Sequence, residues 1–191
     1  MSAEAPVPPL VAAATARARQ TGFPMSCDPA VGRLLAVLAA HLPEGARVLE
    51  LGTGTGVGTA WIVSGLLPRT DVTVTSVEKE PATAAAAASG YWPSFVSLRC
   101  DDALEVLGEG GTFDLIFADA PGGKWEGLDR SVAALLPHGL LIVDDMAPEP
   151  GWTDSHRAAQ DKVRQALVSA PGLTSTELAV GSGVILSVRS A

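Results

Sequence analysis

The chain has 191 residues, of which 47% are hydrophobic and 18% charged, a composition that suits a globular domain with a full core. A net charge of −8 without a Lys/Arg cluster disfavours a nucleic acid as partner. The chain has two cysteines, too few for a disulfide framework or a zinc site, and neither a signal peptide nor a membrane span is visible, so we expect a cytoplasmic protein.

In chain order, strands alternate with helices. Residues 1–9 contain three prolines and are expected to form a loose arm of a single domain that spans residues 1–191. Helices are predicted at residues 10–20, 29–41, 60–66, 81–89, 101–107, 128–136 and 154–170. Strands are predicted at residues 47–51, 71–78, 95–99, 113–119 and 139–145, followed by a hairpin of residues 174–180 and 184–190. This order predicts an α/β, doubly wound, mostly parallel seven-stranded sheet of Rossmann-like type with a C-terminal antiparallel hairpin.

The turn after the first strand carries glycines at four alternate positions, which are Gly52, Gly54, Gly56 and Gly58. Such a turn lets a ligand approach the backbone and points the N–H groups of the next helix at it. The dinucleotide fingerprint G-x-G-x-x-G/A does not fit, because its last position falls on Val57 or Thr59. No Gly-Lys-Ser/Thr of a phosphate loop follows either.

Acidic residues follow the predicted strands. They are Glu78, Asp101, Asp102, Asp119, Asp144 and Asp145. In doubly wound sheets ligands bind at the carboxyl ends of the strands, so these side chains are expected to surround one site.

The glycine turn also reads E-x-G-x-G-x-G from Glu50, which resembles the first motif of class I S-adenosylmethionine-dependent methyltransferases. The resemblance extends through most of the chain to the small O-methyltransferase family that includes the catechol and caffeoyl-CoA methyltransferases. It is carried by the segments MSCDPAVGRLL, RVLELGTGTGVGTA, SVEKEP, DDALEVL, FDLIFADA, LLPHGLLIVDD and ELAVGSGVILSVR.

The resemblance implies that S-adenosylmethionine is the cofactor. Glu78 would accept hydrogen bonds from both ribose hydroxyls, and Asp102 and Ala103 would lie by the adenine, although Asp102 could equally cap a helix. The other implied cofactor-binding residues are Met25, Cys27, Glu50, Gly52, Thr53, Gly54, Gly58 and Asp119. Met25 and Cys27 would otherwise belong to the core.

The resemblance also implies a divalent cation, Mg²⁺ or a similar ion, held by Asp119, Asp144 and Asp145. Lys124 is the implied base, and Asp119 shares the catalytic role. The chain departs from the family pattern in three places: Asp144-Asp145 replaces Asp-Asn, Lys124 falls two residues late on a loop expected to be flexible, and Gly58 replaces a serine. These acids could instead be strand-end residues of a metal-free enzyme, and Lys124 an ordinary solvated lysine.

Four other residues have open roles. His138 is expected before a strand in a structural role, and His156 is a weaker alternative base at the start of a helix. Trp125 and Trp152 could form an apolar wall for a flat acceptor or could simply pack on the domain.

The resemblance, together with these residues, implies a methyltransferase that acts on an oxygen of a small-molecule acceptor. Alternatives are methylation of an RNA base hydroxyl, a cofactor-binding module that has lost catalysis, and an NAD-dependent oxidoreductase. A homodimer is left open.

Overall fold

A computed structural model describes residues 6–191, so residues 1–5 of the predicted arm lie outside the described residues. The helices are α1 (Pro9–Thr21), α2 (Pro29–Ala40), α3 (Val57–Leu66), α4 (Pro81–Ala88), α5 (Ala103–Gly108), α6 (Leu128–Ala133) and α7 (Asp154–Ser169). The strands are β1 (Arg47–Leu51), β2 (Thr73–Glu78), β3 (Val96–Cys100), β4 (Phe113–Ala118), β5 (Leu135–Val143), β6 (Leu173–Leu178) and β7 (Val184–Arg189).

These strands form one seven-stranded sheet in the order β3-β2-β1-β4-β5-β7-β6. Strands β1 to β5 are parallel to their neighbours, and β7 pairs antiparallel with both β5 and β6. The predicted doubly wound sheet with a C-terminal antiparallel hairpin is confirmed. The strand order reverses between β1 and β4, so the carboxyl ends of these two strands mark the position where such sheets bind ligands.

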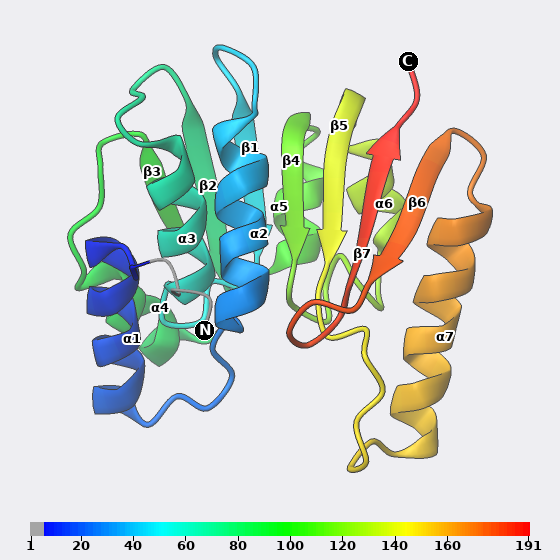
Figure 1. The fold of residues 1–191 in the computed structure, drawn as a ribbon, viewed down its shortest axis with the longest axis horizontal. Helices are drawn as coiled ribbons and strands as arrows, with labels where there is room; N and C mark the ends of the chain where they lie inside the picture. Colours follow the sequence, from blue (N-terminus) through cyan, green and yellow to red (C-terminus); the bar gives the residue numbers. More distant parts are fainter. Residues whose placement is uncertain (1–5) are drawn as a thin grey trace.

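Helices pack on both faces of the sheet (Figure 1). On one face α2 and α3 pack over the β1 side chains Val48 and Glu50, while α5, α6 and α7 cover Leu49 and Leu51 on the other face. The near-continuous hydrophobic run of β1 reflects this double coverage, because both faces of a central parallel strand are buried. None of the helices in the described range is long and apolar enough to cross a membrane.

The segment between β4 and β5 differs from the prediction. The helix expected over 128–136 ends at Ala133, and β5 already begins at Leu135. Leu135 is fully buried and pairs with Phe113, after which the register shifts so that Leu115 faces Leu140. The extra residues form a bulge in which His138 has φ 64°, so this histidine lies inside the strand rather than before it.

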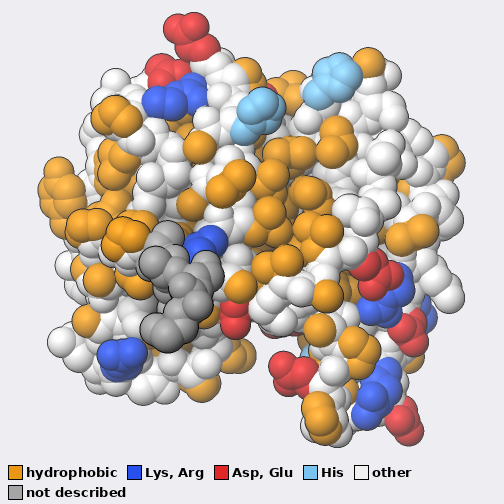
Figure 2. All heavy atoms as spheres, in the orientation of Figure 1, with side chains coloured by type: hydrophobic (Ala, Val, Ile, Leu, Met, Phe, Trp, Pro, Cys, Tyr) orange, Lys and Arg blue, Asp and Glu red, His pale blue; other side chains and the backbone are white. Residues whose placement is uncertain are grey.

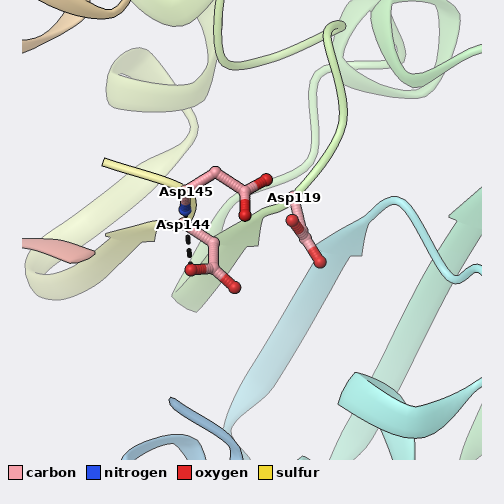
Figure 3. A group of neighbouring side chains, drawn as sticks. All are labelled: Asp119, Asp144 and Asp145. Carbon is pink, nitrogen blue, oxygen red and sulfur yellow. Dashed lines mark hydrogen bonds between the residues drawn. The ribbon is translucent and has the colours of Figure 1, made fainter. Parts of the chain in front are cut away.

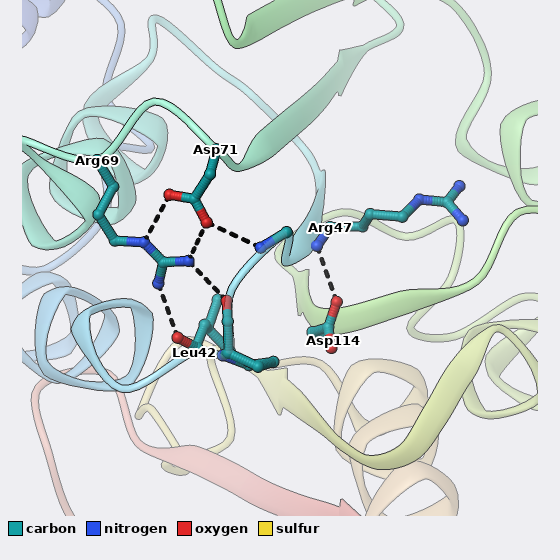
Figure 4. Close-up of polar contacts among 7 residues, drawn as sticks. Leu42, Arg47, Arg69, Asp71 and Asp114 are labelled. Atoms are coloured by element: carbon teal, nitrogen blue, oxygen red, sulfur yellow. Dashed lines mark hydrogen bonds and ion pairs between the residues drawn. The ribbon is translucent and has the colours of Figure 1, made fainter.

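A group of hydrogen bonds fixes the chain at the amino end of β1, which is the end opposite the glycine turn (Figure 4). The Arg69 guanidinium donates to the carbonyls of Leu42 at 2.7 Å and Pro43 at 2.6 Å, and it pairs with Asp71. The same Asp71 carboxylate accepts the Gly45 N–H at 2.8 Å. These bonds hold the turn from α2 into β1, and therefore the strand that leads into the candidate site.

One part of the sheet surface has no helix over it within residues 6–191. In the view of Figure 1, nothing covers the front of β5 and β7, and Figure 2 shows a continuous hydrophobic area there beside α2. The side chains on this face include Leu140 and Leu186, which are partly buried against the α2–α3 core, and Ile142, which is fully buried in it. No charged side chain is visible within it.

Candidate active site

Residues 52–56, here called the glycine loop, leave β1 and cross the end of β2. The N–H groups of Gly52 and Thr53 both donate to the Val77 carbonyl, at 2.9 and 3.0 Å. Gly52 has φ 102°, and a Cβ at this position would lie 2.5 Å from the Asp119 carbonyl. Glycine is therefore required here, both for the backbone conformation and for the close approach of β1 to the end of β4.

Helix α3 begins directly after the loop, three residues earlier than predicted. Gly56 is the N-cap in the left-handed conformation, with φ 90° and no side-chain cap, so the first N–H groups of α3 have no capping side chain. Such N–H groups bind anionic or polar ligand atoms at a helix N-terminus.

Glu50 lies fully buried beneath the loop. Its Oε2 accepts hydrogen bonds from the hydroxyls of Ser76 and Thr59, and Ser76 is also linked to Thr53 at 2.6 Å. Its other oxygen, Oε1, has no partner and faces Gly58, where a Cβ would collide with it. Burial raises the pKa of Glu50 to about 7, against the hydrogen bonds from Ser76 and Thr59. These contacts join Glu50 to the glycine loop through Ser76 and Thr53.

Glu78 ends β2 and faces the glycine loop. Its Oε2 accepts the Gly54 N–H at 2.8 Å, and its Oε1 accepts the Glu80 N–H at 2.9 Å. Glu78 is only partly buried, and each of its oxygens accepts one hydrogen bond here although a carboxylate oxygen can accept two. This is the arrangement that a carboxylate needs to accept two hydroxyls of a ribose.

Asp102 and Ala103 lie at the end of β3. Asp102 caps α5 by accepting the Leu104 N–H at 2.8 Å, and its other oxygen pairs with Lys79 at 2.8 Å. The capping role that the sequence left open is therefore present. Ala103 is buried, and Gly122 of the loop after β4 lies directly over it.

The linker before α2 brings Met25 and Cys27 to the site in different ways. Met25 is 74% exposed, so it does not belong to the core, while its carbonyl approaches Gly54. Cys27 is buried, and its thiol pKa is raised by burial and by the nearby charges of Asp144 and Asp119. The Cys27 thiol therefore sits close to the acidic side of the site.

Asp119, Asp144 and Asp145 converge at the ends of β4 and β5 and are here called the acid cluster (Figure 3). Each contributes a carboxylate oxygen, and these oxygens lie within 4.8 Å of one another. Asp144 accepts from the Ser182 hydroxyl at 2.5 Å and from the Asp145 N–H at 2.7 Å. Burial, followed by repulsion from Asp144 and Asp145, raises the pKa of Asp119, and burial also raises the pKa of Asp144.

Lys124 is buried, so the expectation of an ordinary solvated lysine was wrong. Its side chain is 4% exposed, and its Nζ lies 3.5 Å from Oδ2 of Asp145. Gly123 of this loop explains the burial, because it has φ 86° and packs so closely on Leu51 that a Cβ would overlap it. The loop therefore folds back over β1 and turns Lys124 inward instead of into solvent.

The two loop tryptophans gather around His156, and these three side chains are here called the aromatic wall. The Trp152 ring stacks on His156 at 4.4 Å, and the Trp125 ring meets His156 edge-on at 5.0 Å. Trp125 donates from Nε1 to Gln160 at 3.1 Å, and Gln160 in turn donates to the Asp145 carbonyl at 2.6 Å. The sequence analysis did not predict that Gln160 and Ser182 contact the acid cluster. Ser182 lies in the Gly-Ser-Gly turn of the predicted hairpin, which only weakly indicates such a role, and no sequence pattern marks Gln160.

The residues present fit both groups that the sequence resemblance implies. For the cofactor, the observations are the spare lone pairs of Glu78, the uncapped start of α3 and the close approach at Gly52. For a divalent cation, three carboxylates within reach of one another form the hard oxygen donor set that Mg²⁺ and Mn²⁺ prefer.

Comparison with known proteins also indicates a methyltransferase. The family model described as a methyltransferase domain matches residues 49–146. A protein of Mycobacterium tuberculosis named a probable O-methyltransferase is 33% identical over 94% of this chain and 84% of its own length.

Two solved structures are also similar. Cofactor-bound Rv0187 from MTB is 26% identical, with a TM-score of 0.82 over 98% of this chain and 93% of that one. The O-methyltransferase from Bacillus cereus in complex with SAH is 22% identical, with a TM-score of 0.85 over 98% of this chain and 94% of that one, and it supports the fold. With the glycine loop, Glu78 and the strand order, these matches show that the chain belongs to the family of class I S-adenosylmethionine-dependent O-methyltransferases.

Proposed function

We propose that this protein, as one domain over residues 1–191, transfers a methyl group from S-adenosylmethionine to a hydroxyl oxygen of a small planar molecule. The observation that carries this proposal is the position of the acid cluster, which lies within two residues of the ends of β4 and β5 and directly beside the glycine loop. The donor supplies an electrophilic methyl group on a sulfonium ion. The protein has to align the acceptor oxygen with that methyl group and help the hydroxyl lose its proton.

The glycine loop and Glu78 would hold the donor. Glu78 would accept both ribose hydroxyls, with its own orientation fixed by the N–H groups of Gly54 and Glu80. Gly52 and Thr53 would lie beside the methionine part, and the hydroxyl chain from Thr53 through Ser76 to Glu50 keeps the loop in place. Buried Cys27 would close the opposite side.

The acid cluster would hold a divalent cation, whose chemistry is to lower the pKa of the acceptor hydroxyl. Ser182 and the Asp145 N–H orient Asp144, and Gln160 holds the backbone of Asp145. Lys124 would be the base, with His156 the weaker alternative; as an ammonium ion that donates to Asp145 at 3.5 Å, Lys124 would have to lose a proton before it could accept one from the hydroxyl.

The aromatic wall would contact the flat acceptor. Trp125 is 40% exposed and stands next to Lys124, whose ammonium lies 5.7 Å from the centre of the indole ring. Because Gln160 joins Trp125 to Asp145, the wall and the acid cluster have a fixed relative position. An indole face suits a planar aromatic or conjugated acceptor.

Titration calorimetry with S-adenosylhomocysteine, followed by a labelled-methyl assay on a panel of phenols and catechols, tests this function. We expect cofactor binding together with transfer to at least one acceptor. Binding without transfer to any acceptor, with or without Mg²⁺, would favour the non-catalytic cofactor-binding module. Binding of NAD instead of S-adenosylhomocysteine would overturn the proposal. Salt-dependent capture of RNA on a filter, with methyl transfer to it, would replace the small-molecule acceptor with an RNA base.

We also infer a homodimer in the cytoplasm. The uncharged hydrophobic area over β5 and β7 can meet its own copy without burying unpaired charge. Cys100 is exposed and unpaired, which agrees with a reducing compartment. Light scattering behind a sizing column measures the assembly, and a Leu186→Glu variant should shift it to monomer.

A further inference from the structure

Lys124 is a charged side chain enclosed by the protein. It is 96% buried if the side chain alone is considered, and its single ion pair is the 3.5 Å contact with Asp145. Burial of an ammonium group is costly unless nearby negative charge compensates it. The position of Lys124 therefore has to be explained by the charges that face it.

Those charges are the three carboxylates of the acid cluster. The Lys124 ammonium offsets the burial and the mutual repulsion that raise the pKa of Asp119 and of Asp144. Among residues 6–191, no other lysine, arginine or histidine forms an ion pair with any member of the cluster. Three acids thus share one built-in positive charge.

The loop keeps that charge in place. The Pro121 carbonyl accepts the N–H groups of Trp125 at 2.9 Å and Glu126 at 3.1 Å, and Gly123 donates to the Glu126 carbonyl at 2.7 Å. From α6, the Ser131 hydroxyl donates to the Gly123 carbonyl at 2.8 Å. With the backbone on both sides of Lys124 tied down, its ammonium has little freedom to leave the cluster.

We propose that the Lys124 ammonium is the resident counter-cation of the acid cluster and weakens the binding of a divalent cation there. A fixed positive charge next to the carboxylates repels an incoming dication and makes the cluster stable without one. The third carboxylate, Asp145, is the direct partner of this lysine. The inference rests on the proposed metal ligands of the acid cluster, but it does not depend on which acceptor is methylated.

Mn²⁺ binding to the whole protein, measured by paramagnetic resonance and by calorimetry, tests this role. The variants are Lys124→Met and Lys124→Gln, which both remove the charge, while the glutamine can still donate to Asp145. Lys162→Met is the matched control, because Lys162 is an exposed lysine of α7 and its loss changes the net charge equally. Lys124→Arg keeps the charge.

We expect both neutral Lys124 variants to bind Mn²⁺ at least about tenfold more tightly than the unaltered protein, or about 1.4 kcal/mol. Lys162→Met and Lys124→Arg should stay within about threefold of it. The thermal shift caused by Mn²⁺ should be larger for Lys124→Gln than for the unaltered protein, which keeps the test available if the methionine variant folds poorly.

Equal or weaker Mn²⁺ binding in the neutral variants would overturn the proposal, and so would an equal gain in Lys162→Met or a lack of binding in every variant. Binding of S-adenosylhomocysteine and methyl transfer are measured separately on the unaltered protein. If the unaltered protein shows both but the neutral Lys124 variants do not bind Mn²⁺ more tightly, the role of Lys124 is refuted and the proposed function stands.

Discussion

The raised pKa of Glu50, the buried carboxyl group beneath the glycine loop, can be tested through the pH dependence of stability. The pKa of this buried carboxyl group is raised from 4.5 to about 7, chiefly by burial, and one of its oxygens has no partner. A carboxyl group whose pKa is higher in the folded than in the unfolded state favours folding while it is protonated. That contribution is complete below pH 4.5 and is lost as the pH rises towards 7 and beyond.

The magnitude follows from the shift. Each pKa unit corresponds to about 1.4 kcal/mol, so a shift of about 2.5 units (7 minus 4.5) amounts to roughly 3 kcal/mol in full. Between pH 5 and pH 8 most of this, about 2–3 kcal/mol, should be lost by the unaltered protein but not by Glu50→Gln, which carries no titrating group. The glutamine carbonyl can still accept from Ser76 and Thr59, so the loop contacts are kept.

The assay is urea unfolding of both proteins without cofactor, followed by circular dichroism at several pH values from 5 to 8. The difference in unfolding free energy between Glu50→Gln and the unaltered protein should move in favour of the variant as the pH rises. Other buried acids, such as Asp119 and Asp144, titrate in both proteins, so their effects largely cancel in the difference. A difference that does not change with pH would refute the assignment of a raised pKa to Glu50.

Three further predictions concern the site directly. Glu78→Ala should lower the affinity for S-adenosylhomocysteine by about tenfold or more in calorimetry, because charge-assisted hydrogen bonds are lost, whereas Glu80→Ala, which keeps its N–H, should not. Gly52→Ala should cost more unfolding free energy than Gly45→Ala, since both have positive φ but only the Cβ at position 52 would meet a backbone carbonyl at 2.5 Å; equal losses in urea would contradict the close approach. Trp125→Ala should raise KM for a planar acceptor severalfold in the methyl-transfer assay while leaving the affinity for S-adenosylhomocysteine unchanged, and an unchanged KM would remove the aromatic wall from the acceptor site.

The sequence by itself determined the architecture and the position of the glycine loop. Short apolar runs that alternate with helical segments predict which stretches become strands. The spacing of the glycines after Glu50 distinguishes this loop from a dinucleotide-binding loop. The proximity of the acids at the strand ends could be predicted from the sequence, because the carboxyl ends of parallel strands lie along the same edge of the sheet. These sequence patterns are local and repetitive, so they can be recognised without knowledge of the tertiary packing.

Tertiary structure alone decided the surroundings of the acid cluster. Lys124 looked solvated because loop lysines usually are, but the fold of the loop onto Leu51 depends on contacts far apart in the sequence. The start of β5 at Leu135 was hidden for the same reason, since only pairing with Phe113 distinguishes it from the end of a helix. The links from Gln160 to Asp145 and from Ser182 to Asp144 join segments 15 and 38 residues apart. Side chains of this kind carry no periodic pattern, and only the packing of α7 and the hairpin against the sheet places them beside the carboxylates of the acid cluster.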